Sequence, residues 1–104
     1  MRVLRDYRGL SIRLTDERLA HILDHPEMGG LEAAIEMTLA QPERVVESFS
    51  DPDARLYYRF YAGTVVGDKH LCVIVKQTGR DPFIVTAYLT DRVKRGVLIW
   101  PKEA

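Results

Sequence analysis

The stretch Ile84-Val-Thr-Ala-Tyr-Leu-Thr-Asp91 decides how the second half of the chain is interpreted. Its residues favour β-structure, and successive side chains of a strand point to opposite faces. The two alternating sets are Val85, Ala87 and Leu89 on one side and Thr86, Tyr88 and Thr90 on the other. The pattern therefore predicts a strand with one apolar face in a core and one hydroxyl-bearing face that meets water or a ligand.

Three stretches before it, at about 45–49, 55–61 and 70–76, show the same period of two. Short segments rich in Gly, Pro and Asp separate the four stretches, and such segments are typical of hairpin turns. Connections this short cannot contain the crossovers that parallel strands need. The second half of the chain therefore predicts a four-stranded antiparallel meander.

The first half of the chain has a helical period instead. The spacing predicts a helix from Thr15 to about His25 and a second one from Leu31 to just before Pro42. Val3–Leu14 is expected to form an edge strand or arm. Helices followed by a sheet indicate an α+β fold, in which two short helices pack on one face of the meander.

The length of 104 residues suits a single domain over residues 1–104. Cys72 is the only cysteine, so the chain forms no internal disulfide, and its apolar neighbours indicate a buried thiol in a reducing compartment. The sequence has neither a run of about 18 apolar residues nor a basic leader followed by an apolar segment. We therefore expect a cytoplasmic protein that does not contact a membrane.

The formal net charge is +0, which by itself argues against a nucleic-acid binder driven by electrostatics. The charges are unevenly distributed, however. Residues 1–14 hold four Arg and one acid, residues 15–53 hold two Arg and ten acids, and residues 54–104 hold nine Lys or Arg and four acids. An acidic middle between basic ends allows the fold to present a basic surface despite the neutral total.

Sorting the last three expected strands by alternation predicts two faces of the sheet. The core face would hold Leu56, Tyr58, Phe60, Leu71, Val73, Val75, Phe83, Val85, Ala87 and Leu89. The opposite face would hold Arg55, Tyr57, Arg59, Tyr61, His70, Cys72, Ile74, Lys76, Ile84, Thr86, Tyr88 and Thr90. No carboxylate occurs in the second set, whereas an ordinary solvated sheet face mixes Lys with Glu.

This carboxylate-free face suits a phosphate, because Arg and Lys bind phosphate oxygens and Tyr rings stack on unpaired bases. A plain solvent-facing sheet is the alternative, since Arg, Thr and Tyr also have good β propensity. If the face binds RNA, the substrate contacts would come from Arg55, Tyr57, Tyr61, Thr90, Arg92 and Lys94.

Four stretches together resemble a known family. They are RLTDERLAHILDHPEM at 13–28, LYYR at 56–59, LCVIVK at 71–76 and TAYLTD at 86–91. They resemble the small phage- and bacteria-associated nuclease-like domains of the barnase, EndoU, colicin and RelE superfamily. The resemblance implies helices against a four-stranded antiparallel sheet and RNA cleavage without a metal or other cofactor. It also implies a partner such as an antitoxin or immunity-like protein.

One residue departs from the pattern of these relatives. Asp24 stands before His25-Pro26, where relatives often carry Arg. An acid at this position weakens phosphate contact from the end of the first helix.

RNA cleavage without a metal uses the 2′-hydroxyl of the substrate as nucleophile, so the protein supplies a base, an acid and cations. His25 is the proposed proton carrier, because the reference pKa of histidine is about 6.5. Arg59 and Lys76 would stabilise the charge that builds on phosphorus. Thr86 and Tyr88 would position the phosphate, and Tyr88 would also act as an acid if Lys76 nearby lowers its pKa.

Two histidines have other interpretations. His21 and His25 are spaced for a metal pair on one helix face, but no third ligand follows at a recognised spacing, so we expect no metal. His70 begins the expected strand at 70–76, next to Lys69, and a simple turn residue is its alternative interpretation. Val97–Trp100 is too apolar to lie in water and should add an edge strand or dock on a partner.

The sequence therefore favours a metal-independent endoribonuclease with RNA as its substrate, acting as a toxin of a toxin–antitoxin pair or as a prophage-derived toxin. A non-catalytic domain of the same fold that binds RNA or a protein is the alternative. A homodimer through the C-terminal segment is a third possibility.

Overall fold

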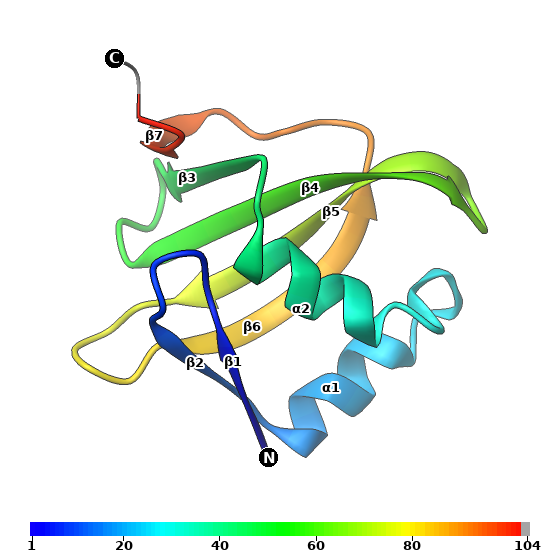
Figure 1. The fold of residues 1–104 in the computed structure, drawn as a ribbon, viewed down its shortest axis with the longest axis horizontal. Helices are drawn as coiled ribbons and strands as arrows, with labels where there is room; N and C mark the ends of the chain where they lie inside the picture. Colours follow the sequence, from blue (N-terminus) through cyan, green and yellow to red (C-terminus); the bar gives the residue numbers. More distant parts are fainter. Residues whose placement is uncertain (103–104) are drawn as a thin grey trace.

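A mixed sheet of seven strands, with two α-helices against one of its faces, makes up the computed structural model, which describes residues 1–102 (Figure 1). The strands lie in the order β1-β2-β6-β5-β4-β3-β7. The elements are β1 (Arg2–Arg5), β2 (Ser11–Leu14), α1 (Asp16–Leu23), η1 (Pro26–Met28), α2 (Glu32–Ala40), β3 (Arg44–Ser48), β4 (Ala54–Thr64), β5 (Gly67–Lys76), β6 (Phe83–Thr90) and β7 (Gly96–Trp100). Neighbouring strands of the described chain are antiparallel, except that β2 and β6 are parallel.

The predicted α+β class, with two helices on one face of a sheet, is confirmed. The four expected strands correspond to β3, β4, β5 and β6, which are adjacent and antiparallel. The prediction that the sheet has four strands and is wholly antiparallel is wrong, because residues 2–14 form β1 and β2 and residues 96–100 form β7. The long connection through both helices allows β2 to lie parallel to β6.

The start of α1 follows from its capping residue. The side chain of Thr15 accepts a hydrogen bond from the backbone N–H of Arg18 at 3.1 Å, and acidic residues fill the first turn. The helix ends at Leu23, and Pro26 begins the 3-10 turn η1. The expected ends of the first helix therefore agree with the structure to within two residues.

The main core lies between the helices and the sheet. Its fully buried side chains come from every layer and include Ile12, Leu14, Ile22, Met28, Ile35, Leu39, Val45, Tyr57, Leu71, Val73 and Val75. The opposite face of the sheet carries no helix and is called the helix-free face below (Figure 1).

The alternation of β4 is opposite to the one predicted. Tyr57 pairs with Val73, which pairs with Ala87, and all three belong to the core under the helices. Arg55, Tyr57, Arg59 and Tyr61 therefore lie on the helix side, whereas Leu56, Tyr58 and Phe60 lie on the helix-free face. Both sets contain aromatic rings, so alternation alone does not tell which one is buried.

A second part of the predicted face assignment is wrong, because β6 contains a β-bulge. Thr86 pairs with Ile74 and Ile84 pairs with Val75, so Val85 has no partner residue on β5. The extra residue reverses the alternation of the first part of β6. Ile84 is therefore buried on the helix side, although the sequence pattern placed it on the opposite face.

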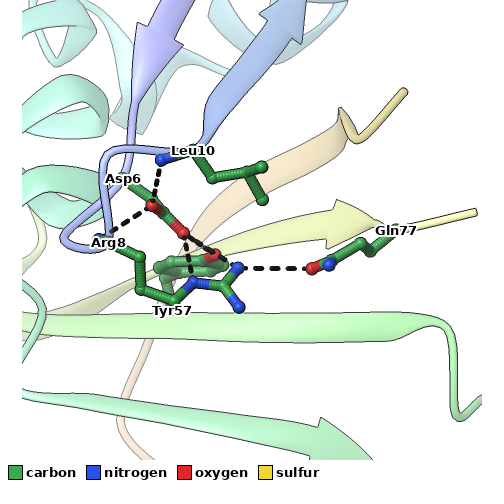
Figure 2. Close-up of polar contacts among 5 residues, drawn as sticks. All are labelled: Asp6, Arg8, Leu10, Tyr57 and Gln77. Atoms are coloured by element: carbon green, nitrogen blue, oxygen red, sulfur yellow. Dashed lines mark hydrogen bonds and ion pairs between the residues drawn. The ribbon is translucent and has the colours of Figure 1, made fainter. Parts of the chain in front are cut away.

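A buried carboxylate connects the β1–β2 turn to β4 (Figure 2). Asp6 is 4% exposed and accepts hydrogen bonds from the hydroxyl of Tyr57 at 2.8 Å and from Nε of Arg8 at 3.1 Å. The backbone N–H groups of Arg8 and Leu10 also donate to it, each at 2.9 Å. Arg8 extends the network to the side chain of Gln77. The turn is thus held by a carboxylate that has four donors.

We predict that Tyr57→Phe lowers the free energy of unfolding by about 2 kcal/mol, because a buried carboxylate loses a charge-assisted hydrogen bond while packing is preserved. Urea denaturation followed by circular dichroism measures the change. Tyr7→Phe is the matched control, since residues 1–102 offer no hydrogen bond to the Tyr7 hydroxyl, and its effect should stay within about 0.5 kcal/mol. Equal stability of the two variants would contradict the prediction.

Candidate functional site

The connection between β6 and β7 defines the candidate site. In the sheet, β5, β4 and β3 lie between β6 and the edge strand β7, so residues 91–95 must pass these three strands (Figure 1, orange). Val93 packs against apolar residues of the helix-free face, and the backbone N–H of Lys94 donates to the hydroxyl of Tyr58 at 3.1 Å. We call residues 91–95 the crossing segment.

A glycine allows the crossing segment to meet β3 closely. Gly96 begins β7 and pairs with Ser48 of β3. A Cβ atom at Gly96 would collide with the backbone carbonyl oxygen of Glu47. The absence of a side chain at this position therefore lets β7 pair with β3 and keeps Lys94 and Arg95 next to that strand.

A second, smaller core lies beneath the crossing segment. Tyr58 and Cys72 are almost fully buried there, and Tyr88 packs against them. Burial raises the pKa of the Cys72 thiol to about 11 and raises the pKa of both tyrosine hydroxyls. These groups stay protonated near neutral pH, so they are packing groups rather than a reactive thiolate or a readily ionised acid.

Two adjoining hollows border the crossing segment on the helix-free face. The larger has a volume of about 500 Å³ and includes Arg44, Phe49, Lys94 and Arg95 in its lining. The smaller has a volume of about 290 Å³ and is lined by Glu43, Arg44, Tyr58, His70 and Val93. Arg44 and Val93 line both hollows. We call the two hollows together the basic groove.

The cations of the basic groove are not neutralised by neighbouring acids. Arg44, Lys94 and Arg95 are exposed and form no ion pair with any residue between 1 and 102. Glu43 is the carboxylate in the lining, and its Oε1 accepts a hydrogen bond from the backbone N–H of Phe60 at 2.6 Å. Three unpaired cations at one hollow favour an anionic ligand with several oxygens.

The five predicted catalytic residues do not come together. His25 is exposed between α1 and η1, with its ring centroid 6.1 Å from that of His21. Arg59 lies on the helix side of β4 and donates to the carbonyl oxygen of Gln41 at 2.7 Å. The remaining three belong to the helix-free face, namely Lys76, Thr86 and Tyr88.

Lys76 differs from the cations of the groove, because its ammonium group forms an ion pair with Asp51. The ion pair raises the pKa of Lys76 and lowers the pKa of Asp51. The positive charge is therefore largely compensated within the protein. The sequence pattern could not reveal this, because Asp51 belongs to the turn before β4 rather than to the face that was sorted.

The predicted substrate-binding residues are also divided. Tyr57 and Tyr61 are on the helix side, where the Tyr61 hydroxyl donates to the carbonyl oxygen of Ala34 at 3.0 Å. Arg55 forms an ion pair with Glu47 at 3.2 Å. Thr90 and Arg92 lie at the end of β6 and just beyond it, where the Thr90 hydroxyl contacts the backbone of Arg92. Of the eleven predicted residues, Lys94 alone lines a described hollow.

Sequence reasoning missed three residues of the groove. Arg44 and Phe49 were not singled out, and His70, which the pattern placed at the start of the strand at 70–76 and which lies within β5, was given no role in the site. Phe49 carried a usable signal, because it is a single aromatic residue between two serines before the Asp51-Pro52 turn. Its side chain is 72% exposed.

Among residues 1–102, His, Cys, Asp and Glu nowhere gather in threes as a bound metal ion would require, and no helix is both long and apolar enough to cross a membrane. No protein-family model, curated protein or solved structure matches the chain.

We predict that the stability of the protein falls as the pH rises from about 9 to 11. The Cys72 thiol ionises near its ordinary pKa of 9.0 in the unfolded chain but only at about 11 when folded, so rising pH favours the unfolded state. The thiol lowers the free energy of unfolding by up to about 1.4 kcal/mol for each pH unit in this interval. Urea denaturation at intervals of half a pH unit measures it.

The Cys72→Ala variant distinguishes the contribution of the thiol to this pH dependence from those of Tyr58 and Tyr88, whose ordinary pKa is 10.0. The variant should lose most of the slope between about pH 9 and 10 and keep the decline above pH 10. An unchanged slope in the lower interval would show that the thiol does not cause it.

Proposed function

We propose that the domain binds RNA through the basic groove on its helix-free face. The observation that carries the proposal is the meeting of Arg44 with Lys94 and Arg95 at one hollow, about fifty positions apart in the chain and without an ion pair to any acid among residues 1–102. Arg binds phosphate oxygens as a planar fork and Lys binds them as a point charge. A chain of phosphates is the ligand that uses several such cations together.

The distribution of charge over the fold supports this proposal. Residues 16–40, which form α1, η1 and α2, contain six acids and one Arg and therefore carry a net charge of −5. These elements cover the face opposite to the basic groove. A polyanion is repelled from the helical face and attracted to the helix-free face, so the neutral total charge does not exclude RNA binding.

The shape of the groove also supports a polymer. The two hollows share Arg44 and Val93 in their linings, so they are adjacent on the same face. The cations lie mainly at the larger hollow, and His70 lies at the smaller one. An extended RNA strand along the groove would therefore place its phosphates at the cations of the larger hollow and pass the His70 imidazole at the smaller one.

RNA cleavage is the second candidate function, and a specific observation favours it. His70 lines the same hollow as Arg44, which brings a proton carrier next to an unpaired cation. In the reaction the 2′-hydroxyl loses its proton and attacks the adjacent phosphorus, while the 5′-oxygen takes a proton and leaves. His70 replaces His25 as the proposed proton carrier, and a toxin with an antitoxin or immunity-like partner remains the biological setting for this activity.

RNA binding is tested with Arg44→Gln, Lys94→Gln and Arg95→Gln combined in one variant. Removing three phosphate contacts should weaken binding of a 12-nucleotide single-stranded RNA at least tenfold at about 0.1 M salt. It should also reduce the slope of log affinity against log salt by about 2, since each contact contributes about 0.7. Fluorescence anisotropy at several salt concentrations measures both effects.

The matched control combines Arg5→Gln, Arg18→Gln and Arg80→Gln, which removes the same charge from exposed positions outside the groove. This variant should change the affinity by less than threefold. If both variants weaken binding equally, only the net charge matters and the groove is not the site.

Cleavage is tested by incubating the protein with RNA in EDTA and searching for 2′,3′-cyclic phosphate ends. His70→Ala should lower the rate at least a hundredfold while RNA affinity stays within threefold, because the imidazole acts on protons rather than on binding. His25→Ala should leave the rate unchanged. Binding of RNA without formation of product would favour the non-catalytic alternative. Loss of the cleavage rate in His25→Ala would support His25, as predicted from the sequence, as the proton carrier.

A further inference from the structure

The larger hollow of the basic groove combines two kinds of surface. Arg44, Lys94 and Arg95 supply charge, whereas Val46, Phe49 and Leu98 supply apolar surface. Val46 is buried in the smaller core, whereas Phe49 is 72% exposed and Leu98 is 39% exposed, so these two residues present apolar surface that the described part of the core does not use. A hollow that only attracted phosphates would need cations but no exposed aromatic ring.

Phe49 lies where a ring can be reached from solvent. It follows β3 directly, in the turn before β4, between Ser48 and Ser50, whose hydroxyl groups contact each other at 3.1 Å. No aromatic ring among residues 1–102 stacks on it, whereas Tyr7 packs on Trp100 and Phe60 packs on His70. One face of the phenyl ring is therefore available to a planar partner.

We infer that the larger hollow holds one unpaired nucleotide of a single-stranded RNA, with its base against Phe49 and its phosphate at Arg44, Lys94 and Arg95. The inference rests on the proposed RNA binding and names the form of RNA that is bound. The base of a duplex is paired and stacked within its helix, so it cannot reach the phenyl ring without being extruded.

The volume of the hollow agrees with this assignment. About 500 Å³ is within the range of small-ligand sites, which is roughly 300 to 1,000 Å³. A phenyl ring accepts any base, because each base has an aromatic face, and the apolar floor from Val46 and Leu98 does not select among bases by hydrogen bonding. The hollow should therefore prefer single strands without a strong preference for sequence.

The test compares a 12-nucleotide single strand with a 12-base-pair duplex RNA in anisotropy titrations of the intact chain. Phe49→Ala should weaken binding of the single strand about 5- to 100-fold and change duplex binding less than twofold. The salt slope should stay as in the wild type, because no phosphate contact is removed. Phe49→Trp should restore the affinity for the single strand.

The controls separate stacking from loss of structure. Val65→Ala truncates another exposed apolar residue, in the β4–β5 turn outside the groove, and should leave both affinities unchanged. A single strand with 2-aminopurine should lose fluorescence on binding to the wild type and to Phe49→Trp, and lose much less on binding to Phe49→Ala. Melting temperatures within about 2 °C of the wild type show that the exposed substitution preserves the fold.

The outcomes distinguish this inference from the function on which it rests. If Phe49→Ala keeps the affinity for the single strand while the triple Gln variant loses it, stacking on Phe49 is overturned and RNA binding stands. If Phe49→Ala weakens single strand and duplex equally, the preference for single strands is overturned. If the wild type binds neither RNA, the proposed function fails and this inference fails with it.

Discussion

The hydrogen bond from Tyr57 to the buried carboxylate of Asp6 is the interaction that joins the β1–β2 turn to the middle of the sheet. Tyr57 makes this bond from the helix side of β4, and strand alternation places its neighbour Tyr58 on the opposite face. There the Tyr58 hydroxyl accepts the backbone N–H of Lys94 and fixes the crossing segment over the sheet. The buried contact on one side of β4 and the anchor of the crossing segment on the other side are thus made by two consecutive tyrosines.

The sequence predicted the local elements well and the distant relationships poorly. The Thr15 cap, the prolines after both helices and the alternating stretches are local signals, and the structure agrees with the helices and with the strands β3 to β6. Tyr57 on the buried face of β4 has Asp6 as its hydrogen-bond partner, which is 51 positions away in the chain and gives no local signal. The groove was not predictable for the same reason, because Arg44 and Phe49 meet residues 94–95 only through the pairing of β3 with β7. A bulge in β6 is a further feature that alternation cannot reveal.

The two faces of the sheet have separate roles in the proposed function. The helix side supplies most of the buried apolar surface and carries the acidic helices, so it provides stability and repels polyanions. The helix-free face has a smaller core and leaves Arg44, Lys94, Arg95, Phe49 and His70 accessible at the groove. Residues that seemed chemically suited to catalysis, such as Arg59 and Lys76, are instead bonded within the protein. Unpaired charge, rather than residue type, marks the candidate site.

The pairing of β7 with β3 has a consequence for how the molecule assembles. Hairpins such as β4–β5 and β5–β6 join neighbours in sequence and can form early, whereas β7 must find a strand about fifty positions earlier. Translation also releases β7 after the other strands of the sheet. Folding intermediates in which β7 is not yet paired would have the helical layer and most of the sheet. They would lack the β7 residues Gly96 and Leu98 in the lining of the larger hollow. The proposed binding groove would therefore be complete only once β7 has paired with β3.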